Sequence, residues 1–137
     1  EKPIETTFEL VDIIKASMPG SALREGHPAK RTFQAIRIEV NDELNSLKIA
    51  LNDSLKLLKK GGRIAVITFH SLEDKIVKEI FKKASEGENW SRNMPINVEQ
   101  KESEFKLITR KPILPSEKEL KENNRSHSAK LRIIEKL

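Results

Sequence analysis

A histidine that follows an apolar run is the residue best placed for chemistry. The run, residues 64–69, is rich in β-branched side chains and follows a Gly-Gly break, a pattern typical of a strand buried on both faces of a parallel sheet. Ligands gather at the carboxyl ends of such strands, so His70, the next residue, is a candidate for contact with a bound substrate. The alternative is a structural role, in which His70 caps a helix or bonds to the backbone.

The residues after His70 predict a helix over 71–84. Ser71 is followed by Asp74 three positions later, a variant of the capping box in which both side chains bond to backbone donors of the first turn. We therefore expect Ser71 and Asp74 to be helix-capping residues rather than catalysts. A buried strand, almost no loop and a capped helix together predict an α/β crossover unit.

Three helices are predicted before this unit. Thr6 and Glu9 have capping-box spacing at the start of the first helix. His27-Pro28 opens the second, whose apolar residues recur every three or four positions as far as Val40. The third is long and carries a stripe of leucines between residues 44 and 58. We expect these stripes to face a core.

The chain after residue 84 is less regular. Residues 85–102 are polar, contain Trp90, and are predicted to form an excursion from the fold or a mobile loop. Strands are predicted at 105–109 and 129–134, with a short helix capped by Ser116 between them. A central strand without parallel partners favours the carboxyl-terminal half of a larger doubly wound α/β domain. A complete small α+β domain is the alternative.

Composition limits the function classes. With 26 basic and 21 acidic residues the net charge is +5, which is compatible with a nucleic-acid partner and with an ordinary soluble protein. The absence of cysteine excludes disulfides and thiolate metal sites. The three histidines are far apart, so no metal site is expected, and no hydrolase pattern is present. No run is of membrane-spanning length, and because the chain starts at Glu1 we expect a natural start upstream.

Three stretches of the chain resemble one family. They are HPAKRTFQAIRI at 27–38, GGRIAVITFHSLEDKIVK at 61–78, and RSHSAKLR at 125–132. Together, and in this order, they resemble the bacterial methyltransferases that make N4-methylcytidine in 16S ribosomal RNA with S-adenosylmethionine. The Phe-His-Ser-Leu-Glu-Asp segment is the most specific of these motifs, and the resemblance covers nearly the whole chain.

The resemblance implies a class I, Rossmann-like methyltransferase fold with an inserted helical substrate-recognition domain. Residues 1–40 then correspond to the end of the inserted domain, and residues 41–137 to the carboxyl-terminal half of the methyltransferase domain, with the last two strands as an antiparallel edge. The family's glycine-rich cofactor loop belongs to an amino-terminal half, and no such loop occurs here. We therefore expect a fragment with most cofactor contacts outside it, inactive by itself.

The resemblance also gives the candidate site residues roles. His70 would contact the exocyclic amine of a target cytosine that has left its stack. A set of cationic residues would contact RNA phosphates: Arg24, His27, Lys30, Arg31, Arg37 and Arg125. The alternatives are a solvated helix face with intrahelical ion pairs and, for Arg125, structural anchoring of its loop.

The partner implied by the resemblance is 16S ribosomal RNA or the small ribosomal subunit, in the cytoplasm and away from membranes. A homodimer is a further expectation, because an uncovered sheet edge favours pairing with a second chain. The alternative function, from a different class, is a basic RNA-binding module with no catalytic role.

Overall fold

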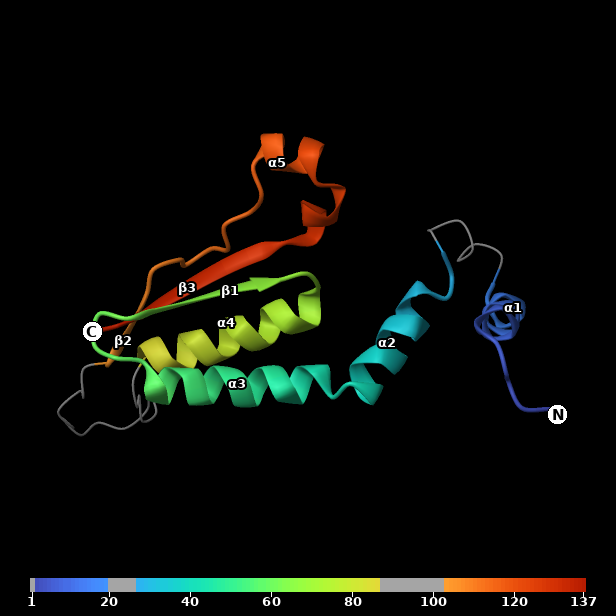
Figure 1. Ribbon diagram of the computed structural model, residues 1–137, viewed down its shortest axis with the longest axis horizontal. Coiled ribbons are helices and arrows are strands. Elements are labelled where there is room, and N and C mark those ends of the chain that lie inside the picture. Colours follow the sequence, from blue (N-terminus) through green and yellow to red (C-terminus); the bar gives the residue numbers. More distant parts are fainter. Residues whose placement is uncertain (1, 20–26, 87–102) are drawn as a thin grey trace, which may run out of the picture. The chain divides into compact units, whose positions relative to one another are not determined.

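The computed structural model describes residues 2–19, 27–86 and 103–137 (Figure 1). Their contacts divide the chain into two units, Glu1–Glu43 and Leu44–Leu137. A boundary after residue 40 was predicted from the sequence. The assignment of residues 1–40 and 41–137 to two parts of a larger protein stays a prediction. Arg24 and Trp90 lie outside the described residues.

The first unit contains two helices. Helix α1 (Thr7–Ser17) begins with the predicted capping box, in which Thr6 and Glu9 bond to each other's backbone. Helix α2 (Lys30–Val40) follows Ala29, the buried residue at its amino end. The prediction that the apolar stripe of α2 faces a core is wrong at the carboxyl end of the helix, where Val40 is 78% exposed. The described residues of this unit provide no second layer to cover it.

The second unit contains a three-stranded sheet in the order β1-β3-β2. Strands β1 (Arg63–Thr68) and β2 (Phe105–Leu107) both pair antiparallel with β3 (Lys130–Lys136), so they run parallel to each other. An isolated bridge between Ile113 and Leu131 prolongs the pairing along β3. The architecture is therefore mixed α/β, with the strand nearest the carboxyl end in the middle.

Two helices cover one face of this sheet (Figure 1). Helix α3 (Glu43–Leu57) starts at the last residue of the first unit, and helix α4 (Ser71–Glu86) follows β1. The core consists of buried apolar residues from both helices and β3: Leu51, Leu55, Ile76, Val77, Phe81 and Ile134. Each such side chain contributes roughly 1.5–3 kcal/mol through its burial. The leucine spacing of α3 predicted this inward face correctly at its centre.

Strand β1 differs from its prediction. It was expected to be buried on both faces, but its burial alternates, with Ala65 and Ile67 exposed and Ile64 and Val66 packed against the core. The physical reason is that α3 and α4 lie on the same side, and no described residue covers the other. Among the described residues, β1 is also an edge strand, because β3 is its only partner.

Short elements complete the second unit. Gly61, with φ +76, turns the chain from α3 into β1, and its N–H donates to the Lys136 carbonyl. Helix α5 (Glu117–Glu122) is capped by Ser116, and the 3-10 turn η2 (Asn124–Ser128) leads into β3. Among the described residues, no helix is long and apolar enough to span a bilayer.

Candidate functional site

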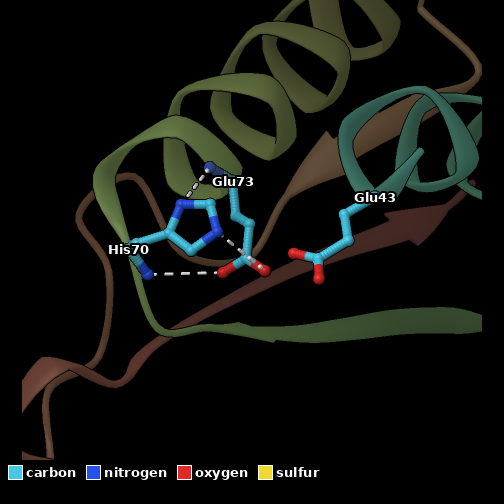
Figure 2. A group of neighbouring side chains, drawn as sticks. All are labelled: Glu43, His70 and Glu73. Atoms are coloured by element: carbon cyan, nitrogen blue, oxygen red, sulfur yellow. Dashed lines mark hydrogen bonds and ion pairs between the residues drawn. The ribbon is translucent and has the colours of Figure 1, made fainter. Parts of the chain in front are cut away.

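His70 lies at the carboxyl end of β1, in the short link to α4, as the sequence indicated (Figure 2). Its ring is fixed by the backbone: Nδ1 accepts a hydrogen bond from the Glu73 N–H at 3.3 Å. In return, Glu73 Oε2 accepts from the N–H groups of Phe69 and His70, at 2.9 and 3.3 Å. These reciprocal bonds form a capping box with histidine in the place usually taken by serine or threonine.

The predicted cap residues are therefore corrected. Helix α4 begins at Ser71, so the N-cap position is occupied by His70, and the partner three residues on is Glu73 rather than Asp74. Ser71 lies within the first turn, where its hydroxyl is not in the cap position. The N–H of Asp74 already donates to the His70 carbonyl, as in an ordinary first turn.

The cap determines which proton the His70 ring carries. Because Nδ1 accepts a hydrogen bond, the neutral ring holds its proton on Nε2, an assignment that follows from the bonding pattern. The Nε2 atom is buried without a hydrogen-bond partner among the described residues and lies 3.3 Å from Glu73 Oε1. The N–H on Nε2 therefore lies in a buried position beside the Glu73 carboxylate and is not open to solvent. Capping is what the structure shows for His70, and contact with a nucleotide stays a prediction.

Asp74 has a different partner, on β3. Its carboxylate accepts two hydrogen bonds from the Arg132 guanidinium, at 2.8 and 3.2 Å, and lies 3.5 Å from Lys130 Nζ. Arg132 is only 7% exposed. The Arg132 hydrogen bonds hold the pKa of Asp74 below its usual range, with a further lowering by the charge of Lys130. This ion pair joins the first turn of α4 to the middle strand.

The predicted RNA-binding residues of the first unit fall into two groups. His27, Lys30 and Arg31 are exposed and form no ion pair with any described residue. Arg37 instead binds Glu43 with two hydrogen bonds, of 2.8 and 3.2 Å, which is the alternative of a paired charge. Glu43 is also drawn in Figure 2 as the first residue of α3.

Arg125, the remaining predicted RNA-binding residue, lies on η2 in the second unit. Its N–H donates to the Asn123 side chain, so the backbone there is held locally, while the exposed guanidinium has no ion-pair partner in the described part of the chain. The backbone bond fits structural anchoring of the loop, and the free guanidinium leaves RNA contact as a prediction.

A basic groove in the second unit was not among the sequence predictions. It lies between α4 and the segment after β2, and four of its lining residues are cationic: Lys78, Lys82, Arg110 and Arg132. The signal was present, because Lys78 and Lys82 are one helical turn apart. What the sequence did not reveal is that Arg110 and Arg132 face the same space.

The described glycines do not form a cofactor cradle. A Cβ at Gly61 would meet nothing within 4 Å, and the atoms nearest to a Cβ at Gly62 would be the Lys59 carbonyl oxygen and two carbons of the Leu58 side chain. Both glycines serve the turn into β1. These two glycines therefore do not form the glycine-rich cofactor loop that the family resemblance implies, and cofactor contacts are expected elsewhere.

A family model and two relatives by sequence place the chain among the same group of proteins. The model of the MraW methylase family matches residues 1–137. A protein of Lactobacillus johnsonii named ribosomal RNA small subunit methyltransferase H is 61% identical over 138 residues, covering 100% of this chain and 44% of the relative. A protein of the same name from Lactobacillus delbrueckii subsp. bulgaricus is 61% identical over 137 residues, covering 99% of this chain and 43% of the relative. The chain thus spans less than half the length of these relatives.

Proposed function

The chain belongs to the MraW methylase family, and we propose that it is part of an S-adenosylmethionine-dependent methyltransferase that makes N4-methylcytidine in 16S ribosomal RNA. The observation that carries the proposal is the family match over residues 1–137, together with relatives named for methylation of small-subunit ribosomal RNA. Because the chain spans 44% of the first relative, the activity is proposed for the whole protein.

We expect this part of the protein to bind the RNA substrate rather than the cofactor. S-adenosylmethionine supplies an activated methyl group, and the protein must hold the cytosine amine in line with it. The described glycines form no cradle for that cofactor, so this chain alone is expected to be inactive. Its proposed task is to receive a base that has left its stack and to hold the strand that carries it.

We propose His70 as the residue that contacts the target base. Two observations support this: its place at the carboxyl end of β1, and the capping box with Glu73 that fixes its ring. With the proton on Nε2, which is buried beside Glu73, the ring would donate to the carbonyl oxygen or ring nitrogen of cytosine once a movement of Glu73 uncovers it. It does not offer a lone pair to the N4 amine, which was the role first expected, unless the cap opens.

The cationic residues of the chain are proposed to bind the RNA backbone. His27, Lys30 and Arg31 are the best supported in the first unit, because none of them is engaged in an ion pair with a described residue. Arg125 has the same property in the second unit. Such contacts orient a strand without reading its sequence.

The alternative function is a basic RNA-binding module without catalysis. The net charge of +5 is compatible with it, because a basic chain can bind RNA without catalysing a reaction on it. The two proposals differ in what the whole protein does with the cofactor, since a module has no reason to bind it.

The test combines binding with transfer. S-adenosylmethionine is titrated calorimetrically into the whole protein and into this chain alone, and the whole protein is then incubated with labelled cofactor and small ribosomal subunits. The methyltransferase proposal expects binding by the whole protein only, and N4-methylcytidine in digests of the RNA. A whole protein that binds the RNA but neither binds the cofactor nor transfers a methyl group would establish the module instead.

A further inference from the structure

The groove between α4 and the segment after β2 has an apolar floor and a basic rim. Its volume is about 230 Å³. The floor is formed by Phe81, which is 1% exposed, and the half-buried Leu107. Exposed Lys78 and Lys82 lie on the α4 side, and exposed Arg110 lies on the other. Every lining residue belongs to the second unit.

The four cationic residues of the groove differ in whether they already form ion pairs. Arg132 is already bound by Asp74 through two hydrogen bonds. Lys82 lies 3.5 Å from the Glu86 carboxylate, the one acidic residue among those that line the groove. Lys78 and Arg110 form no ion pair with any described residue. The groove therefore presents two positive charges, one on α4 and one on the segment after β2, that form no ion pair with a described carboxylate.

This arrangement suits a chain of phosphates better than a single small anion. Lysine and arginine that neutralise phosphates release counterions, and two separated cations across a groove can contact successive phosphates. An apolar floor between them can accommodate the sugar edge of the strand. The lining contains no exposed aromatic ring on which a base could stack, and no asparagine or glutamine for a bidentate pair with adenine.

We propose that this groove, through Lys78 and Arg110, is a sequence-independent binding site for the phosphate backbone of the RNA substrate. It is additional to the cationic residues of α2 and to Arg125. Lys78 is eight residues after His70 along α4, which corresponds to about 12 Å of helix. The groove would thus hold the strand beyond the target nucleotide and set its direction. The proposal rests on the proposed function, because that function makes RNA the ligand.

The test uses the whole protein and a fragment of small-subunit ribosomal RNA as the probe. The double variant Lys78→Ala/Arg110→Ala removes the two cationic side chains that form no ion pair with a described residue. The matched control, Lys83→Ala/Lys121→Ala, removes the same number of exposed lysine or arginine charges from α4 and α5 outside the groove. The dissociation constant is measured at several salt concentrations, and circular dichroism checks that all proteins are folded.

The groove variant should weaken RNA binding and lower the slope of log affinity against log salt by about 2, roughly one for each lost phosphate contact. The control should keep the wild-type slope, and a probe of unrelated sequence should show the same loss. An unchanged slope in the groove variant, or an equal fall in the control, would overturn the site. Methyl transfer by the wild-type protein distinguishes failure of the groove from failure of the proposed function. If the wild type transfers methyl groups but the groove variant keeps the wild-type slope, only the groove is refuted. If the wild type binds RNA without transferring a methyl group, the proposed function is refuted.

Discussion

The two units of this chain are built in different ways. In the second unit, helices α3 and α4 enclose an apolar cluster against the sheet, with Phe81 at 1% exposure. In the first unit, Ala29 is the one buried residue among those described, and Phe8 of α1 is 80% exposed. The first unit has local helix signals and almost no core of its own, whereas the second has both.

The difference shows where the stability of the chain lies. Helices α1 and α2 are 11 residues each, a length that is marginal for a helix without tertiary packing. Caps such as the Thr6–Glu9 box determine where such a helix begins but contribute only about 1 kcal/mol. Burial in the second unit contributes several times more for each large side chain. We therefore expect substitutions in the second unit to unfold the chain and comparable ones in the first to be tolerated.

The largest expected contrast is between two phenylalanines. Phe81→Ala should lower the free energy of unfolding of the 137-residue chain by about 4 kcal/mol, because it leaves a cavity beneath the sheet. Phe8→Ala should change it by less than about 0.5 kcal/mol, since that ring is exposed. Denaturant unfolding followed by circular dichroism measures both. Equal losses would mean that the first unit has a core of its own.

The next effect concerns the ion pair between α4 and β3. Asp74→Asn should cost about 3 kcal/mol, because Arg132 stays buried without its counter-charge. The paired control is Asp53→Asn, whose exposed partner Lys56 is on the same helix, with an expected loss of less than about 1 kcal/mol. Unfolding free energies of the two variants give the comparison, and losses of similar size would show that the Asp74 pair behaves like a surface pair.

The same pair predicts how stability changes with acid. The pKa of Asp74 is lowered in the folded protein, so its contribution is complete above the unfolded pKa of about 3.9 and is lost as the pH falls through the folded value. Stability should therefore decrease between about pH 5 and more acidic conditions, and Asp74→Asn should flatten that part of the curve. A variant as acid-sensitive as the wild type would assign the loss to other carboxylates.

A smaller effect distinguishes the two roles of His70. His70→Ala should cost about 1 kcal/mol through loss of the cap, while His70→Asn, which can accept the same Glu73 N–H, should recover most of it. Methyl transfer by the whole protein provides the second measurement. If His70 contacts the base, both variants lose activity. If it only caps the helix, His70→Asn stays active, and the proposed contact is refuted.

The smallest stability effect is expected for Arg37. Its pair with Glu43 is exposed, so Arg37→Ala should cost less than about 1 kcal/mol. RNA binding is more informative: a change in the salt slope of about 1 would show that Arg37 contacts a phosphate despite this pair. Lys48→Ala, an exposed residue of α3, is the control. An unchanged slope would leave Arg37 with the structural role alone.

Most helices and strands were predictable, since their signals are local. The strand after Gly61-Gly62, the helix after it and the Thr6–Glu9 box appear where spacing and composition placed them. The cap of α4 was misplaced by one residue, because Ser-x-x-Asp matches the usual capping box while histidine is not a usual member of it. The ends of strands were less accurate, as at β2, which is shorter than its apolar pattern.

The family, the order of the elements and the inward-facing side of α3 could all be read from the amino-acid sequence, because motif and periodicity are properties of neighbouring residues. Features that depend on residues far apart in the chain were set by the tertiary structure. It placed β3 between β1 and β2, joined Asp74 to Arg132 across 58 positions, and brought Arg110 and Lys78 to the same groove. Such pairings depend on which strand enters the sheet beside which, and no local spacing specifies that choice.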